Sequence, residues 1–239
     1  MSYANLTIND SNVIKRYLHR NRYRQALTGL KNYPSSFSGS ILDFGGGNGE
    51  LCKYIYGKFP NAKIVLYELT PSIREEAINN LKEYPQIEIV GDLKDISLPE
   101  FDIIFCMEVF EHIVEEQYSL LFDEFIKLMS GESLLIISVP VEVFLPALLK
   151  GIFRMCRRYG AYDANIRNVL KCTIGKPPQK RIRGTIENSL PYYYEHLGFD
   201  YRVFQYKLSK FFNIVRSYGG PIPFLTPSLN FEKYYICRK

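Results

Sequence analysis

The sequence predicts an α/β protein built around a mostly parallel sheet of seven strands, with helices on both faces. Short apolar segments alternate with helical patterns from residue 38 to residue 140, and a glycine-rich turn follows the first apolar segment. Strands that are covered on both faces have nearly continuous apolar sequences, and these segments have that character. The chain has 239 residues, which is enough for one large domain with a full hydrophobic core.

Seven segments have the length and apolar content of strands. They are residues 40–44, 62–69, 87–92, 101–109, 133–140, 211–218 and 231–239. Helical patterns occur at residues 12–30, 50–59, 71–84 and 115–129. The predicted organisation is an N-terminal helical cap (1–37), a core (38–140), a basic helical insertion or lid (141–210) and closing strands of the same domain (211–239).

Positive charge is concentrated in the predicted insertion. The chain has a formal net charge of +5, yet residues 150–183 contain ten basic residues and a single acid, Asp163. A second basic group lies near the N-terminus and consists of Lys15, Arg16, Arg20, Arg22 and Arg24. Such clusters suit an anionic substrate or surface, and a solvated face produces the same pattern. The two interpretations stay open.

The sequence predicts a cytoplasmic protein without a transmembrane segment. The first residues, MSYANLTIND, lack the basic and apolar regions of a secretory signal. The longest apolar stretch, residues 134–149, contains Glu142 and two prolines, so it is too short and too interrupted to span a bilayer. The five cysteines are scattered without a ligand spacing, which indicates reduced thiols.

The glycine-rich turn at residues 45–49 is the most informative segment. It connects the first strand to a predicted helix, and in open α/β sheets this strand end binds nucleotide-like cofactors. Glycine permits positive φ and a close approach of ligand to backbone. No register of the dinucleotide fingerprint GxGxxG places its last glycine on a glycine. The pattern is instead DxGxGxG from Asp43, which suits a cofactor that carries positive charge.

This segment resembles motif I of the class I S-adenosylmethionine-dependent methyltransferases, and later segments resemble that family's motifs in the same order. Glu68 follows Gly49 by 19 residues, where the family has the acid that holds the ribose hydroxyls. Asp92 matches the family's acid near the adenine amino group. The sequence FDIIFCMEVFEHI, from Phe101, resembles the EVxEH motif of the small-molecule branch. The resemblance covers residues 38–140 and implies a Rossmann-like sheet with an antiparallel last strand.

The resemblance implies that S-adenosyl-L-methionine is the cofactor and S-adenosyl-L-homocysteine the product. The residues that it implies for cofactor binding follow the first four strands: Asp43, Phe44, Gly45, Gly46, Gly47, Gly49, Glu68, Leu69, Asp92, Leu93 and Met107. A carboxylate that accepts two hydroxyl protons suits the ribose role of Glu68. Asp43 and Asp92 also have an ordinary interpretation as turn residues.

Candidate catalytic residues follow the fourth strand. Methyl transfer to a hydroxyl requires a base, and Glu108, Glu111 and His112 cluster there. A helix that begins near Val109 would place Glu108 and His112 on one face. His196, flanked by tyrosines, is a second candidate, and a purely structural histidine is the alternative at both positions.

No metal site is predicted. Glu108, Glu111 and His112 would need a remote ligand to hold an ion, and no second cluster of acids and histidines appears in the sequence.

The leading functional prediction is an O-methyltransferase that acts on a small, or lipid- or sugar-linked, anionic acceptor. An RNA methyltransferase is an alternative, because aromatic residues are interleaved with the basic clusters. The fourth-strand motif lacks the [DNS]-P-P-[YF] sequence that is typical of amino-directed nucleic-acid methyltransferases. The other alternative is a membrane-surface binding protein, since the apolar residues 143–153 lead into a basic segment. Peripheral membrane contact is compatible with either enzyme, and the sequence contains no signal for an oligomeric state.

Overall fold

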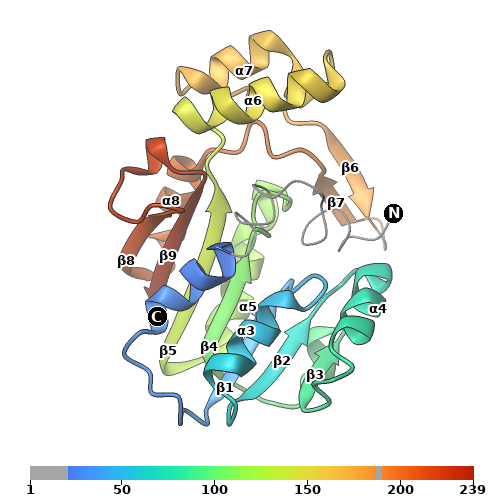
Figure 1. Ribbon diagram of the computed structural model, residues 1–239, viewed down its shortest axis with the longest axis vertical. Helices are drawn as coiled ribbons and strands as arrows, with labels where there is room; N and C mark the ends of the chain where they lie inside the picture. The colour runs from blue at the N-terminus through green and yellow to red at the C-terminus, as the bar shows by residue number, and fades with distance from the viewer. Residues whose placement is uncertain (1–20, 187–189) are drawn as a thin grey trace. The chain divides into compact units, whose positions relative to one another are not determined.

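The computed structural model describes residues 21–186 and 190–239 and contains a seven-stranded sheet (Figure 1). The strand order is β3-β2-β1-β4-β5-β9-β8. The strands are β1 (Ser40–Phe44), β2 (Lys63–Tyr67), β3 (Ile87–Val90), β4 (Phe101–Met107), β5 (Met129–Pro140), β8 (Asn213–Gly220) and β9 (Glu232–Arg238). The predicted number of strands and the mostly parallel sheet are confirmed.

The first strands of the sheet are parallel and in a continuous register. Ser40 lies opposite Lys63 and Phe44 opposite Tyr67, while Ile64 lies opposite Ile87. β1 pairs with β4 in the same direction. The arrow of β9 points opposite to that of β5 in Figure 1, so the last part of the sheet is antiparallel as the resemblance implied. The carboxyl ends of β1, β2 and β3 therefore lie at one edge of the sheet.

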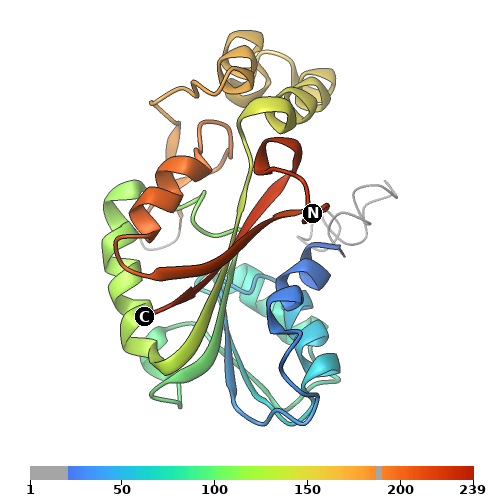
Figure 2. The ribbon, with the colours of Figure 1, turned by 90° about the vertical axis from the view of Figure 1, so that its left-hand side faces the viewer.

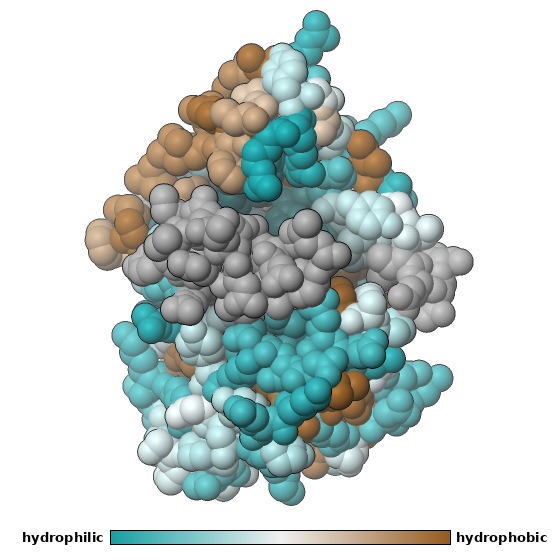
Figure 3. Space-filling view, turned by 45° about the vertical axis from the view of Figure 1, so that its right-hand side comes forward, coloured by the Kyte–Doolittle hydropathy of each residue, from teal (hydrophilic) through white to brown (hydrophobic). Residues whose placement is uncertain are grey.

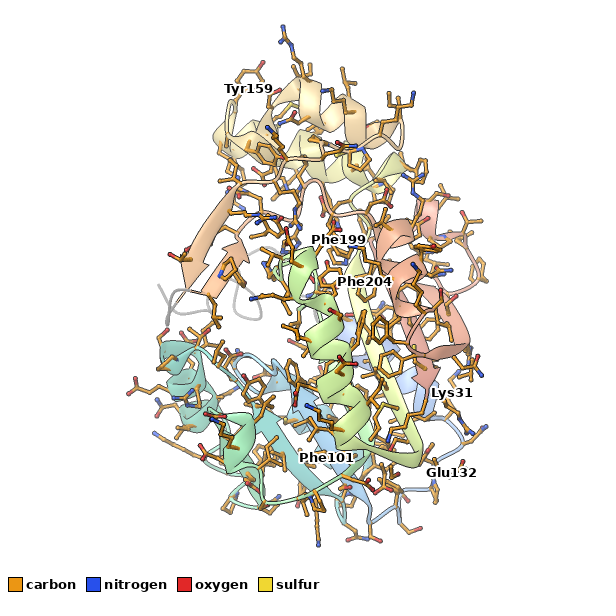
Figure 4. The ribbon with its side chains drawn as sticks, turned by 180° about the vertical axis from the view of Figure 1, so that it is seen from behind. Lys31, Phe101, Glu132, Tyr159, Phe199 and Phe204 are labelled. Carbon is orange, nitrogen blue, oxygen red and sulfur yellow. The ribbon has the colours of Figure 1, made fainter. Side chains whose placement is uncertain are left out.

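Helices cover both faces of this part of the sheet. Helix α3 (Glu50–Lys58) lies in front of the sheet in Figure 1, and α5 (Tyr118–Leu128) lies in front when the molecule is seen from behind (Figure 4). The rings of Phe125 on α5 and Phe44 on β1 are 4.9 Å apart. Helix α4 (Pro71–Asn80) begins with Pro71, whose fixed φ suits a first helical position.

The chain divides into two compact units. Unit 1 comprises residues 1–107, 124–137 and 236–239, and unit 2 comprises residues 108–123 and 138–235. Unit 1 contains the strands β1 to β4 with α3 and α4. Its core is aliphatic and aromatic, with Ile41, Leu42, Ile104 and Phe105 fully buried.

Unit 2 contains the segments between β5 and β9, and its core is rich in aromatic side chains. The Phe204 ring lies 4.8 Å from that of Phe110, 6.0 Å from that of Phe199 and 5.8 Å from that of Tyr235 (Figure 4). Its helices are α6 (Phe144–Arg158), α7 (Ile166–Thr173) and α8 (Tyr201–Leu208). Figure 2 shows the long strand β5 leading up to α6.

A β-hairpin in unit 2 corrects the prediction that the insertion at residues 141–210 is helical. β6 (Arg183–Ile186) pairs antiparallel with β7 (Leu190–Tyr193), so that Arg183 lies opposite Tyr193. The Arg183 guanidinium lies 5.7 Å from the Tyr193 ring centre. Strands of four residues, stabilised by one such cross-strand pair, have too little apolar pattern to be recognised from sequence.

The predicted N-terminal helix is only partly described. Residues 21–26 are helical and continue into the 3-10 turn η1 (Leu27–Leu30), in which Leu30 is buried. Residues 12–20, with Lys15, Arg16 and Arg20, lie outside the described residues. Among residues 21–186 and 190–239, no helix combines the length and the apolar content needed to cross a bilayer.

Candidate active site

The glycine turn of unit 1 has a backbone that only glycine adopts readily. Gly45, Gly47 and Gly49 have φ values of 68°, 57° and 80°, in the left-handed region. Gly46 is required for a different reason, because a Cβ atom there would lie 2.8 Å from Oδ2 of Asp43. The N–H groups of Gly45 and Gly46 donate to the carbonyl of Tyr67 at 2.8 and 3.1 Å, which holds the turn against the end of β2. The turn is therefore fixed in one conformation at the end of β1.

Glu68 follows β2 and faces this turn. Its Oε2 accepts a hydrogen bond from the N–H of Gly47 at 3.1 Å, and its Oε1 accepts one from the N–H of Thr70 at 2.8 Å. The residue is buried. Each carboxylate oxygen has a second acceptor direction, so a carboxylate fixed in this way can also accept two hydroxyl protons. The orientation predicted for the ribose-binding acid is therefore available.

Asp43 lies beneath the turn and is buried. Burial raises the pKa of its carboxyl to about 7, against which a hydrogen bond from the Cys52 thiol acts to lower it. The carboxyl contacts the position where Gly46 would carry a Cβ. Asp43 thus supports the turn, and its predicted cofactor role stays a prediction.

The other predicted cofactor residues also lie at the strand ends of unit 1. Asp92 is exposed, and its Oδ1 accepts the N–H of Lys94 at 3.0 Å, so it caps the 3-10 turn η2 (Leu93–Asp95). Met107 ends β4 and is partly exposed. The carbonyl of Leu69 accepts from Arg74 at 3.2 Å. The capping bond of Asp92 matches its ordinary interpretation as a turn residue, which leaves its second carboxylate oxygen for a ligand.

Two residues that the sequence did not indicate hold this region in place. Arg74 Nη1 on α4 donates to the carbonyls of Glu68 and Leu69, at 2.8 and 3.2 Å. Asn80 Nδ2 donates to the carbonyl of Asn48 in the glycine turn at 2.9 Å. Arg74 and Asn80 lie between 5 and 32 positions along the chain from the residues whose carbonyls they bind. Polar residues on a helix show no local pattern that would reveal such partners.

Unit 2 has its own cluster of candidate residues, which consists of Glu111, His112 and His196. The Nε2 atoms of the two histidines are 3.2 Å apart. Oε1 of Glu111 lies 3.9 Å from Nε2 of His112 and 4.0 Å from Nε2 of His196. The Glu111 side chain is fully buried, whereas those of His112 and His196 are 19% and 31% exposed. The two imidazoles are therefore accessible to a ligand.

The hydrogen bonds of His112 determine which nitrogen carries its proton. Nδ1 lies 2.7 Å from the carbonyl of Tyr193, which only an N–H can satisfy, so the lone pair of the neutral ring is on Nε2. The ring stacks on Tyr192 with centres 4.8 Å apart and an interplanar angle of 1°. Burial lowers the pKa of His112. The pKa of His196 is lowered by its own burial and by the neighbouring His112 ring. Both rings are neutral at physiological pH.

Arg181 holds the two halves of this cluster together. Its Nη2 donates to the carbonyls of Glu111 and Glu195, each at 2.6 Å, and its guanidinium lies 3.9 Å from the Tyr193 ring centre. These carbonyls precede His112 and His196 in the chain. The sequence indicated Arg181 only as one of the basic residues of the insertion, because its partners are distant in sequence.

The segment after β4 corrects the predicted helix near Val109. The strand ends at Met107, and Glu108 has a φ of 56°, which ends the extended conformation. The N–H groups of His112 and Ile113 donate to the carbonyls of Val109 and Phe110, so the segment forms successive turns. The Glu108 carboxylate accepts from the Ser138 hydroxyl at 3.3 Å and is not a member of the Glu111–His112–His196 cluster.

The cluster has the composition of a metal site, with His196 as the remote ligand that the sequence could not supply. One ligand atom from each residue lies within 4.8 Å of the others. Two nitrogens 3.2 Å apart, each about 2.1 Å from an ion, would subtend roughly 100° at it. That angle is compatible with tetrahedral or octahedral coordination, so the donor set fits a divalent cation such as Zn²⁺.

Comparison with known proteins identifies one part of the chain. Residues 41–131 match the model of a family described as methyltransferase domain. Residues 41–131 of this chain are therefore a methyltransferase domain, as the resemblance to the class I S-adenosylmethionine-dependent methyltransferases implied. The chain is 37% identical over 78 residues to an esculetin O-methyltransferase of Kitagawia praeruptora. The aligned segment covers 32% of this chain and 20% of that protein, so the chain matches about a fifth of its relative's length.

Solved structures share the fold of this methyltransferase chain. The PH0226 protein of Pyrococcus horikoshii OT3 has a TM-score of 0.60 and 12% identity, over 99% of this chain and 95% of that one. The N-methyltransferase NodS of Bradyrhizobium japonicum WM9 has a TM-score of 0.55 and 15% identity, over 95% and 99%. At these identities the likeness shows the fold alone. The predicted family and its cofactor, S-adenosylmethionine, are confirmed, and the roles of individual residues stay predictions.

Proposed function

We propose that this methyltransferase transfers a methyl group from S-adenosylmethionine to an oxygen of a small, or lipid- or sugar-linked, anionic acceptor. The observation that carries the proposal is the buried carboxylate of Glu68, held by the N–H groups of Gly47 and Thr70 beside a glycine turn. This arrangement presents an oriented acceptor for vicinal hydroxyls next to a turn whose glycines permit a close approach of a ligand. A cytoplasmic location remains part of the proposal.

The residues of unit 1 fit the cofactor. Glu68 would hold the ribose hydroxyls, the glycine turn would accommodate the amino-acid part, and Asp92 would face the adenine. The cofactor supplies an electrophilic methyl group when it is bound. The strand ends carry acids rather than a cluster of basic residues, which suits a ligand without phosphate.

The histidine pair of unit 2 supplies a base for a hydroxyl acceptor. A hydroxyl must lose its proton during methyl transfer, and Nε2 of His112 carries a lone pair at neutral pH because Nδ1 donates to Tyr193. His196, whose Nε2 is 3.2 Å away, donates its own N–H to that lone pair and holds the His112 ring in place until the acceptor hydroxyl replaces it. The esculetin relative is named for O-methylation and NodS for N-methylation, so the preference for oxygen rests on the base.

A second candidate role for the same cluster is to hold a divalent cation. The observation that favours it is the convergence of Glu111, His112 and His196 within 4.8 Å. A cation there would lower the pKa of an acceptor hydroxyl. In this role no imidazole would be needed to remove the proton of that hydroxyl. The two roles predict opposite responses to a chelator.

The function is tested with S-adenosylmethionine carrying a labelled methyl group. Purified protein is incubated with metabolite, lipid and RNA fractions, and the labelled product is identified. Label in a small or lipid-extractable anionic molecule, attached to oxygen, supports the proposal. Label in RNA would favour the alternative nucleic-acid function, and no binding of S-adenosylhomocysteine in calorimetry would contradict the proposal at its first step. Gly46→Val, which places a side chain against Asp43, is the matched inactive control.

A further inference from the structure

Helices α6 and α7 of unit 2 expose a continuous set of large apolar side chains. Seven of them are between 43% and 66% exposed. They form what we call the α6–α7 face: Leu145, Leu149, Ile152, Phe153, Ile166, Leu170 and Ile174. Their spacing of three, four and seven or eight residues places each helix's members on one side. Figure 3 shows apolar residues gathered over this end of unit 2.

These residues are not needed to pack the two helices together. The opposite side of α6 and α7 forms its own buried cluster with Ala147, Val169, Cys172 and Leu197. The helices approach so closely there that a Cβ atom on Gly151 would lie 2.4 Å from Val169. Each helix therefore has a buried side that stabilises the fold and a second apolar side that faces solvent. Large apolar side chains gathered on an exposed face are characteristic of an interaction site.

Much of the positive charge of the segment 150–183 is used within unit 2. Lys150 and Arg154 bind Glu142, at 2.9 and 2.8 Å, and Arg158 binds Asp163 at 2.5 Å. Burial would raise the pKa of Glu142, but Lys150 and Arg154 lower it, so this carboxylate is charged. Arg183 binds Glu116 at 2.7 Å and Arg181 binds backbone carbonyls.

Five cations of the segment remain available. Across the part of the chain that the structure describes, no carboxylate lies within ion-pair distance of them, and all five are exposed: Arg157, Arg167, Lys171, Lys176 and Lys180. Arg157 follows Phe153 by one helical turn and lies over its ring at 5.4 Å, so it borders the α6–α7 face. Arg167 and Lys171 directly follow Ile166 and Leu170, so they border the same face.

Three of these cations line one hollow beside α7. The hollow has a volume of about 630 Å³, and its lining includes Lys171, Lys176 and Lys180 together with Ile174 of the α6–α7 face. The Tyr162 hydroxyl donates to the carbonyl of Lys180 at 2.6 Å, and Asn168 donates to the carbonyl of Tyr162 at 2.9 Å. These bonds support the wall of the hollow. Positive charge and apolar surface thus meet at a shallow, open hollow.

We propose that the α6–α7 face docks on an anionic lipid bilayer. The aliphatic and aromatic side chains would enter the boundary between headgroups and acyl chains, and the five cations would contact the phosphates. The hollow would receive a phosphate-bearing headgroup between Lys171, Lys176 and Lys180. This inference does not depend on the methyl transfer proposed above, because it rests on a different surface.

Charge complementarity favours a lipid surface over other occupants. A second copy of this chain would bring an identical set of five unpaired cations against the first, and like charges repel. Single-stranded RNA would satisfy the cations, but its bases stack on aromatic rings, and six of the seven residues of the face are aliphatic. An anionic bilayer matches both the charge and the aliphatic side chains.

Vesicle flotation of the full chain tests the proposal. We expect binding to vesicles of phosphatidylcholine mixed with phosphatidylglycerol, little binding to phosphatidylcholine alone, and weaker binding as salt is raised. Neutralising Lys171, Lys176 and Lys180 to Gln should weaken binding by roughly a hundredfold, since one cation near an anionic surface contributes about fivefold. Leu149→Glu with Leu170→Glu should abolish it.

Matched controls make each outcome decisive. Lys63, Lys82 and Lys94 are exposed lysines of unit 1, and their change to Gln should leave vesicle binding nearly unchanged. Leu120→Glu on α5 is the control for an exposed leucine. Circular dichroism confirms that the variants fold. The proposal is overturned if the wild-type chain does not float with anionic vesicles, if both triple variants weaken binding equally, or if Leu149→Glu with Leu170→Glu instead abolishes a dimer seen in sedimentation equilibrium.

Discussion

The Nε2 atoms of His112 and His196 lie 3.2 Å apart, although 84 residues separate the two histidines in the chain. Nδ1 of His112 donates to the Tyr193 carbonyl, so the lone pair on its Nε2 accepts the N–H of His196. Arg181 holds the turns that precede both histidines. The pair is accessible and neutral, which are the two properties that a base for an acceptor hydroxyl requires.

Replacing His112 tests the base directly. His112→Gln should reduce turnover by about 10²–10⁴-fold, because a general base contributes on that order, while S-adenosylhomocysteine affinity stays unchanged. The pKa of His112 lies below its ordinary value, so the wild-type rate should be flat above about pH 6.5 and fall as the ring is protonated at lower pH. A rate that instead rises as pH falls would contradict the assignment.

A chelator separates the two roles of the Glu111–His112–His196 cluster. If an imidazole acts as the base, turnover after dialysis against EDTA should equal that of untreated protein. If the cluster holds a cation, turnover should fall and recover on addition of a divalent metal, and His196→Gln should prevent metal binding in calorimetry. Measuring both turnover and metal content makes the result independent of the choice of acceptor.

Glu68→Gln should weaken cofactor binding, because it removes a hydrogen-bond acceptor as well as a charge. Both carboxylate oxygens accept backbone N–H groups, so the amide NH₂ of Gln would face a donor and leave it unpaired. The expected loss is about 1–3 kcal/mol in S-adenosylhomocysteine affinity. Calorimetry of Glu68→Gln and of the exposed control Glu75→Gln checks this. Equal affinities in the two variants would show that Glu68 has no part in the site.

Asp43 should make the stability of the chain depend on pH. Burial raises its pKa from 3.8 to about 7, so the folded chain binds more protons than the unfolded chain between these values. The contribution of Asp43 is therefore most favourable below pH 3.8 and is lost as pH rises through about 7. The Asp43→Asn variant has no carboxyl to titrate at this position. The unfolding free energy of the variant minus that of wild type should therefore increase from pH 5 to pH 8 by on the order of 3 kcal/mol. Urea unfolding at the two pH values measures the difference, and a constant difference would refute it.

Arg181 should act as a positioning residue. Arg181→Met keeps the stem over Tyr193 but leaves the carbonyls of Glu111 and Glu195 without their donor, so we expect a loss of about 1–3 kcal/mol in unfolding free energy. Turnover should fall more than KM changes, because the histidines lose their mutual orientation. Arg157→Met, which removes an exposed cation, is the matched control. Unchanged turnover in Arg181→Met at full folding would exclude the positioning role.

The sequence alone determined the sheet and the glycine turn that follows its first strand. Buried parallel strands such as residues 40–44 have continuous apolar sequences, and the turn at residues 45–49 contains glycines where the backbone takes positive φ, so both are local properties of the chain. Glu68 could be placed because it directly follows a recognisable strand. The hairpin β6–β7 escaped prediction because its pairing depends on cross-strand contacts rather than on an apolar pattern.

Only the tertiary structure decided which side chains meet in unit 2. The contact between His112 and His196, and the two carbonyls held by Arg181, join residues that lie 14 to 84 positions apart. The same holds for charge: ten basic residues look alike in the sequence, but buried acids such as Glu142 and Asp163 neutralise some of them and leave others exposed. Local propensity fixes elements over a few residues, whereas partner choice depends on how distant segments pack, and no local pattern encodes it.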